Sequence, residues 1–113
     1  MKIAIIVIVV LLGLSVIGSK LLPKGATTLP DNPFLVDVRT AQEFASGSVQ
    51  GATNIPLSTV HDSIHLLEDK GNIVVFCRSG NRSGKAKHIL ESKGVKAVTN
   101  GGSWQNVRDL LQK

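Results

Sequence analysis

The chain has 113 residues, a formal net charge of +5 and one cysteine, which is enough for one domain and excludes both an internal disulfide and a zinc site built on paired cysteines. The charge is uneven, because residues 77–113 carry eight basic and two acidic side chains, whereas residues 25–76 carry two basic and six acidic ones. The basic half favours a small anionic ligand, and nucleic acid is not expected because the chain has four aromatic residues and no recognition motif.

The first part of the chain is apolar. The run Ile3–Ile17 is almost uninterrupted, and as a helix it would be about 22 Å long, short of a hydrocarbon core of about 30 Å. Extension to Leu22 closes the gap if the Lys20 side chain reaches the interface. We therefore expect residues 1–22 to be a transmembrane anchor or a signal peptide, with the anchor favoured. The domain is then expected in the cell envelope, facing the periplasm or the exterior, after a proline-containing linker at residues 23–33.

From residue 34 to residue 113, short apolar runs alternate with segments of helical spacing. The predicted strands are Phe34–Val38, Thr53–Ile55, Ile73–Phe76 and Val95–Val98. The first predicted helix is a turn from Thr40 through Phe44, with Glu43 completing a capping box, and the second is capped by Ser58 or Thr59 and has Val60, Ile64 and Leu67 on one face. The third is Ser83–Ser92, ended by Lys93-Gly94. The last is capped by Ser103 and has four inward-facing residues, Trp104, Val107, Leu110 and Leu111. Residues 100–103 are predicted to form a turn. This alternation predicts an α/β domain with a parallel sheet covered on both faces.

Titratable side chains outside the cysteine loop are expected to be structural. His61 and His65 lie one helical turn apart, but no third ligand accompanies them, so we expect exposed side chains and no metal site. His88 is likewise expected to be exposed on its helix. Asp37, Arg39 and Glu43 are expected to form a fixed charge network.

The stretch Cys77–Ser83 carries the predicted chemistry. It holds the only cysteine and joins a buried strand to a helix, so Cys77 lies where unpaired N–H groups favour the thiolate. Arg78 and Arg82 add two positive charges. A thiolate among N–H donors and arginines is suited to attack a sulfur or phosphorus oxyanion. A buried structural cysteine is the alternative, but it would not need such polar neighbours.

A set of motifs follows in a characteristic order along residues 34–111. They are Asp37-Val38-Arg39, Glu43-Phe44, Gly51–Leu57, the Cys77–Ser83 loop and Gly101-Gly102 before Trp104. Together they resemble the single-domain rhodaneses, and the run Ser83–Lys87 and the short length look most like the small phage-shock-type envelope rhodaneses. One departure is Gly47-Ser48-Val49, where many relatives carry Gly-His-Ile. We expect that change to affect the packing of the turn and not the chemistry.

The resemblance implies a rhodanese-like three-layer fold and sulfur transfer in two steps. Cys77 would take the outer sulfur of thiosulfate, sulfite would leave, and the persulfide would pass its sulfur to cyanide or a thiol. By position, the substrate would be bound by the loop residues Arg78, Ser79, Gly80, Asn81, Arg82 and Ser83, with the two arginines on the sulfonate oxygens. Asp37 and Arg39 would position these residues without contacting the substrate themselves. No metal or organic cofactor is implied, and a monomer is expected.

Other functions stay open at this stage. Four residues separate Cys77 from Arg82, one fewer than in the phosphatases and arsenate reductases that use a cysteine loop. The shorter ring fits a sulfur atom better than a tetrahedral phosphate, so sulfur transfer is favoured. A membrane-tethered persulfide carrier or binding module with little thiosulfate activity would share the same cysteine and loop.

Overall fold

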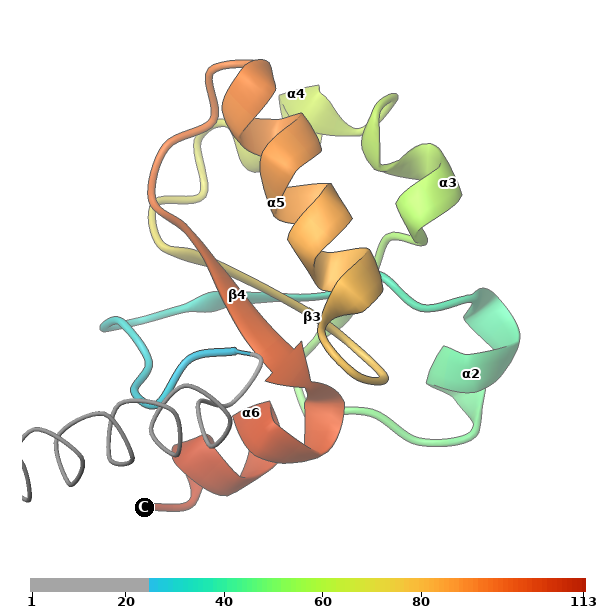
Figure 1. Ribbon diagram of the computed structural model, residues 1–113, viewed down its shortest axis with the longest axis vertical. Helices are drawn as coiled ribbons and strands as arrows, with labels where there is room; N and C mark the ends of the chain where they lie inside the picture. Colours follow the sequence, from blue (N-terminus) through green and yellow to red (C-terminus); the bar gives the residue numbers. More distant parts are fainter. Residues whose placement is uncertain (1–24) are drawn as a thin grey trace, which may run out of the picture.

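Residues 25–113 are described by the computed structural model, and within them four strands alternate with helices (Figure 1). The strands are β1 (Phe34–Asp37), β2 (Thr53–Asn54), β3 (Ile73–Cys77) and β4 (Val98–Ser103), and the helices are α2 (Ala41–Ala45), α3 (Leu57–Val60), α4 (Ile64–Leu67), α5 (Asn81–Ser92) and α6 (Trp104–Leu111). Apolar runs form β1 and β3, whereas β2 and β4 are mostly polar or glycine. The predicted anchor or signal peptide, residues 1–22, lies outside the described residues. Within residues 25–113, no helix has the length and apolar character needed to cross a membrane.

Strand β3 lies inside a four-stranded parallel sheet with the order β2-β1-β3-β4. All of its residues are buried, which explains why its sequence is a continuous apolar run without polar alternation. The predicted parallel α/β sheet is therefore confirmed. Cys77 lies at the carboxyl end of β3, the end of such strands where ligands bind.

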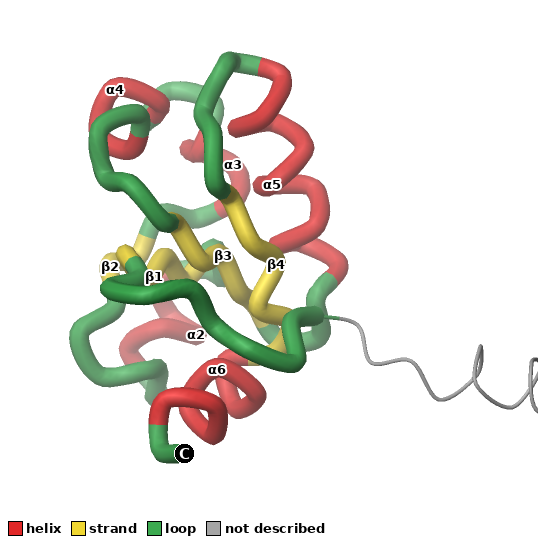
Figure 2. The backbone as a smooth tube through the Cα atoms, turned by 90° about the vertical axis from the view of Figure 1, so that its left-hand side faces the viewer, coloured by secondary structure: helices red, strands yellow, loops and turns green. Residues whose placement is uncertain are grey.

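Helices cover both faces of the sheet (Figure 2). Successive side chains of β3 point to opposite faces. Ile73, Val75 and Cys77 belong to the core cluster that includes buried residues of α3, α4 and α5, whereas Val74 and Phe76 belong to the cluster that includes Val107 of α6. The alternation places the cysteine on the same face as α5, the helix that its loop enters.

The described part of the predicted linker, residues 25–33, contains no helix or strand but is held against the domain. The N–H of Ala26 donates to the carbonyl of Asn100 at 2.9 Å, and Asn106 Nδ2 donates to the carbonyl of Ala26 at 3.0 Å. Leu29 packs against the core cluster on the α6 face. These residues therefore cover part of that face.

Strand β4 differs from the prediction, because it covers the residues expected to form a turn. The sequence predicted a strand over Val95–Val98 and a turn over residues 100–103, but the chain turns earlier, at Ala97, whose φ is 57°. Two glycines in a row suggested a turn, yet Gly101 lies within the strand because α6 approaches it closely. A Cβ atom there would lie 2.5 Å from Val107 Cγ2. Glycine in a strand can mark such a close approach.

The helix predicted to run from Ser58 or Thr59 through Leu67 is split into α3 and α4. The Ser63 hydroxyl donates to the carbonyl of Thr59 at 2.9 Å, and this side-chain bond competes with continuation of the helix. Val60 and Leu67 are nevertheless buried, so both short helices still contribute to the core.

Several helix ends agree with the prediction. Thr40 and Glu43 form a capping box at α2, Ser103 caps α6 by accepting the N–H of Asn106, and Gly94 follows the end of α5 with a φ of 87°. Helix α5 begins two residues earlier than predicted, at Asn81. The inward orientation expected of Leu111 is wrong, because this side chain is 44% exposed on the last turn of α6.

We predict that Gly101→Ala destabilises the domain by about 1–3 kcal/mol, because the added methyl overpacks the core. Its neighbours would be Val107 Cγ2 at 2.5 Å and Val74 Cγ1 at 2.9 Å, and both side chains are fully buried. The matched control is Gly84→Ala in α5, where the new Cβ would meet only Asn100 Nδ2 at 3.5 Å. This substitution should stabilise the domain by about 0.5–1 kcal/mol, because alanine favours the helix over glycine. Urea unfolding measures both, and equal effects of the two substitutions would contradict this packing.

Candidate active site

The sulfur of Cys77 lies in a cradle of hydrogen-bond donors. The side chain is 1% exposed, and its Sγ accepts the N–H of Gly80 at 3.0 Å and the N–H of Ser83 at 3.5 Å. The Ser83 hydroxyl oxygen lies 3.4 Å from Sγ. Gly80 precedes the first residue of α5 and has a φ of 98°, a conformation that glycine adopts readily. The short connection from β3 to α5 therefore turns its N–H groups toward one sulfur atom.

This environment favours the thiolate of Cys77. Burial of the sulfur works against the charged form. The Ser83 hydroxyl, when its proton turns to the sulfur, and the backbone N–H groups of Ser83, Ser79 and Gly80 together outweigh burial and lower the pKa of Cys77. A lowered pKa makes more of the nucleophilic thiolate available near neutral pH. The predicted role of the strand-to-helix turn thus has a specific geometric basis.

Arg82, in the first turn of α5, is held by a carboxylate from another element. Its two terminal nitrogens donate to Glu43 of α2 at 2.6 and 2.9 Å, and both side chains are about one-third exposed. The hydrogen bond from Arg82 is the main cause that lowers the pKa of Glu43 to about 2, with the backbone N–H of Thr40 adding to it. Glu43 therefore stays ionised and paired well below neutral pH. The predicted role of Arg82 in binding sulfonate oxygens stays a prediction.

Three of the other loop residues predicted to bind substrate lie at the surface. Arg78, Ser79 and Asn81 are exposed, whereas Gly80 and Ser83 are buried like Cys77 itself. The loop thus presents one cation and short polar side chains to solvent, while its buried members contact the sulfur. Which of the exposed residues touch substrate also stays a prediction.

Asp37 and Arg39 form a buried ion pair at the end of β1, the strand beside β3. Arg39 donates to both carboxylate oxygens of Asp37, with a shortest distance of 2.7 Å, and also to the carbonyl of Gly47 at 2.6 Å. The Ser48 hydroxyl donates to Asp37 at 2.7 Å. Glu43, which pairs with Arg82, is not part of this group, so the expected network is confirmed only for Asp37 and Arg39. Ser48 therefore helps to fix the pair.

Asn100 of β4 contacts the cradle and was missed by the sequence analysis, which placed it in a turn. Its Oδ1 accepts the Ser83 hydroxyl at 2.7 Å, and its Nδ2 donates to the carbonyl of Gly80 at 3.1 Å. The signal in the sequence was an asparagine directly before two glycines. That pattern does not show by itself that Asn100 lies near the cysteine; the pairing of β4 with β3 brings it there.

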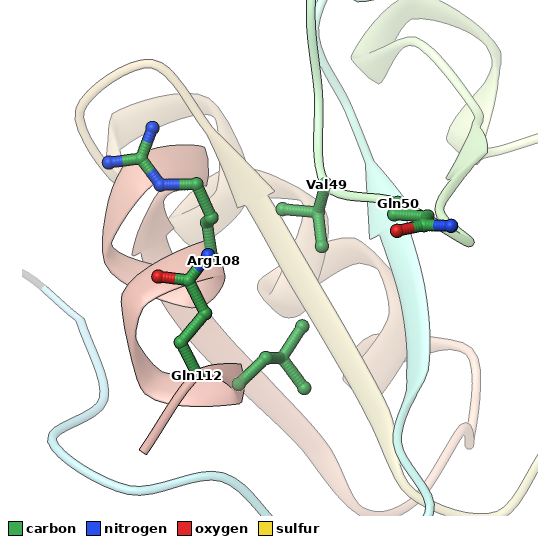
Figure 3. Close-up of a pocket in the computed structure, with 5 residues that line it drawn as sticks. Val49, Gln50, Arg108 and Gln112 are labelled. Carbon is green, nitrogen blue, oxygen red and sulfur yellow. The ribbon is translucent and has the colours of Figure 1, made fainter.

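Two surface hollows have different relations to the cysteine loop. One of about 260 Å³ lies between α6 and the residues that precede β2. Figure 3 shows Arg108 on the helix, Gln112 directly after its end, and Val49 and Gln50 on the facing segment. No loop residue and no nucleophilic side chain lines it. The other, of about 250 Å³, is lined by Val38, Thr40, Pro56, Leu57, Ser58 and Arg82. It therefore adjoins the first turn of the helix that follows the cysteine.

The histidines take no part in this site. His61, His65 and His88 are all exposed, as predicted. Within residues 25–113, no cluster of three or more histidine, cysteine, aspartate or glutamate side chains could hold a metal ion.

Comparisons with known proteins agree with this geometry. The family described as Rhodanese-like domain matches residues 21–109. Thiosulfate sulfurtransferase PspE from Escherichia coli is 39% identical over 74 residues, which are 64% of this chain and 71% of that protein. A putative mitochondrial thiosulfate sulfurtransferase from Schizosaccharomyces pombe is 32% identical over 92 residues; the match covers 69% of this chain and only 65% of that relative's length.

Solved structures give the same picture. A rhodanese with anions from E. coli superposes with a TM-score of 0.61 at 37% identity and covers 66% of this chain and 89% of its own. The human single-domain sulfurtransferase TSTD1 superposes with a TM-score of 0.60 at 27% identity and covers 68% of this chain and 81% of its own. The overall arrangement of sheet and helices is therefore shared with these solved structures.

Proposed function

Because this chain belongs to the rhodanese-like domain family, we propose that it moves a sulfane sulfur from thiosulfate to cyanide or a thiol acceptor through a persulfide on Cys77. Relatives named as thiosulfate sulfurtransferases support sulfur transfer in general. The observation that carries the proposal is the cradle, in which the Gly80 N–H at 3.0 Å and the Ser83 N–H at 3.5 Å converge on one buried sulfur. Backbone donors fixed in this way can stabilise negative charge on that sulfur without reorganisation.

In the first step, the Cys77 thiolate attacks the outer sulfur of thiosulfate. A bond forms between Sγ and that sulfur, the sulfur–sulfur bond within thiosulfate breaks, and sulfite leaves with the electron pair. The lowered pKa of Cys77 supplies the thiolate, and the basic charge of residues 77–113 favours approach of the dianionic donor.

In the second step, the acceptor attacks the outer sulfur of the persulfide. The new bond forms between acceptor and sulfur, the bond from that sulfur to Sγ breaks, and the Cys77 thiolate is regenerated as the leaving group. The N–H groups of Gly80 and Ser83 again face the charged atom. The same cradle therefore serves the attacking sulfur in one step and the leaving sulfur in the other.

Arg82 is the candidate for binding the sulfonate oxygens, because it is a cation in the turn that follows the cysteine and one wall of the adjoining hollow. Its guanidinium is already paired with Glu43, so an incoming anion competes with a carboxylate. We propose that Glu43 weakens thiosulfate binding while it holds Arg82 in place. Arg78, which is exposed on the loop, is the second candidate.

A location in the cell envelope is also part of the proposal. It rests on the apolar run Ile3–Ile17 alone, which lies outside the described residues. A chain anchored or exported in this way would meet its donor and acceptor outside the cytoplasm. Localisation of the full-length chain with and without residues 1–22 tests this part independently of the chemistry.

We predict that Cys77→Ser abolishes thiocyanate formation from thiosulfate and cyanide, because the persulfide cannot form on a hydroxyl. The fold should be retained, since serine differs from cysteine by one atom at a position that already has hydrogen-bond donors. The measurement is a steady-state assay of both proteins, with unfolding curves as the control for folding. Turnover by the serine variant at the wild-type rate would rule out the covalent mechanism. A folded wild-type protein with no turnover would favour a persulfide carrier fed by a protein donor.

We predict opposite effects of substitutions at the two ends of the Arg82–Glu43 pair. Arg82→Ala should raise the KM for thiosulfate about tenfold by removing a charge-assisted hydrogen bond, whereas Glu43→Gln should lower KM because the guanidinium loses its competing anion. The matched control is Lys85→Ala, which removes an exposed cation of the same helix and should leave KM unchanged. If Glu43→Gln raises KM as Arg82→Ala does, Glu43 serves only to position Arg82 and does not compete with thiosulfate for it.

A further inference from the structure

The side-chain amide of Asn100 has only one possible orientation. The N–H of Gly102 lies 3.0 Å from Oδ1, and the carbonyl of Gly80 lies 3.1 Å from Nδ2. A backbone N–H can only donate and a carbonyl can only accept. The atom that faces Gly102 is therefore the amide oxygen, and the atom that faces Gly80 is the amide nitrogen.

This orientation determines where the hydroxyl proton of Ser83 points. Ser83 Oγ lies 2.7 Å from Asn100 Oδ1, and an amide oxygen has no proton to give, so the hydroxyl must donate to it. A serine hydroxyl has one proton. Ser83 therefore presents only lone pairs to Cys77 Sγ, which lies 3.4 Å away, and its side chain is fully buried.

Ionisation of Cys77 consequently favours a change at Ser83. The thiol can donate its proton to Ser83 Oγ, but a thiolate facing the same lone pairs is repelled. Once the S–H proton has left to a base in solvent, the hydroxyl stabilises Sγ only by turning its proton from Asn100 to the sulfur. Asn100 Oδ1 keeps the N–H of Gly102, so it is not left without a partner. The thiolate thus gains one hydrogen bond at the expense of another.

We propose that Asn100 is a positioning residue for Cys77. Its amide oxygen competes with the thiolate for the single hydroxyl proton of Ser83, and this competition sets how strongly Ser83 stabilises the thiolate. Competition of this kind limits how far the cradle stabilises the thiolate. A thiolate becomes a weaker nucleophile as its pKa falls, so Asn100 keeps the sulfur reactive. The proposal rests on the proposed function, because it assumes that Cys77 acts as the nucleophile.

The loop does not depend on Asn100 alone for its shape. The carbonyl of Gly80 also accepts the N–H of Gly84 at 3.0 Å, so loss of the amide leaves the first turn of α5 anchored. Asn100 therefore affects the Cys77 sulfur mainly through the hydroxyl proton of Ser83.

The charged groups around the cysteine are separate from this route. They are the buried Asp37 and Arg39 at the end of β1, Arg82 on α5, its partner Glu43 on α2, and Arg78 on the loop itself. Strand β4, which carries Asn100, has no titratable side chain within Val98–Ser103. A neutral substitution at Asn100 leaves these charges unchanged.

The test is the pH dependence of Cys77 alkylation by iodoacetamide in the full-length chain, a reaction in which Sγ bonds to carbon and iodide leaves. Asn100→Leu keeps the branched shape at Cγ and removes both polar atoms, and it should lower the pH midpoint by about 0.5 to 1, the effect of one hydrogen bond. Ser83→Ala should raise the midpoint, and Asn100→Leu added to Ser83→Ala should not change it further. No sulfur donor is present, so the result is independent of whether thiosulfate is the substrate.

The control is Asn54→Ala in β2, which loses two hydrogen bonds to the carbonyls of Asp37 and Arg39, both at 3.0 Å, and should leave the midpoint at the wild-type value. If Asn100→Leu leaves the midpoint unchanged, raises it, or lowers it equally in the Ser83→Ala protein, the proposal is overturned. Should Asn100→Leu fail to fold, Asn100→Asp retains an acceptor for Ser83. Asn100→Asp must then raise the pH midpoint more when Ser83 is present than when it is replaced in Ser83→Ala. Equal rises in the two backgrounds would overturn the proposal.

Discussion

The convergence of backbone N–H groups on the Cys77 sulfur is the interaction on which the rest of the site depends. It requires the carboxyl end of β3 and the first turn of α5 to be joined by three residues, with Gly80 at positive φ so that its N–H turns inward. Parallel neighbours on both sides hold β3 in place. A sulfur at this position is buried and yet surrounded by donors, a combination that a purely apolar core does not provide.

Two elements outside the loop hold its side chains in place. Glu43 on α2 binds Arg82 in the first turn of α5, while Asn100 on β4 binds Ser83, whose N–H and hydroxyl contact the sulfur. Both partners come from segments that the loop contacts only in the folded domain. The reactivity of the cysteine is therefore a property of the sheet order and the helix packing as much as of the loop sequence.

The sequence was sufficient where the determining contacts are local. The strand before Cys77, the helix after it and the capping box at Thr40 all depend on residues a few positions apart, and the predicted α/β fold with helices on both faces of the sheet is confirmed. The role of Asn100 could not be predicted, because glycines placed inside a strand by the close approach of Val107 have the same local pattern as a turn. The pairing of Arg82 with Glu43 joins residues 39 positions apart, so local sequence gives no sign of it.

The most direct test of persulfide chemistry on Cys77 is the intact mass of the full-length chain before and after incubation with thiosulfate. Transfer through this cysteine predicts a gain of one sulfur atom that cyanide removes and that Cys77→Ser does not show. An unchanged mass in a folded protein, or a gain that persists in Cys77→Ser, would contradict transfer through this cysteine.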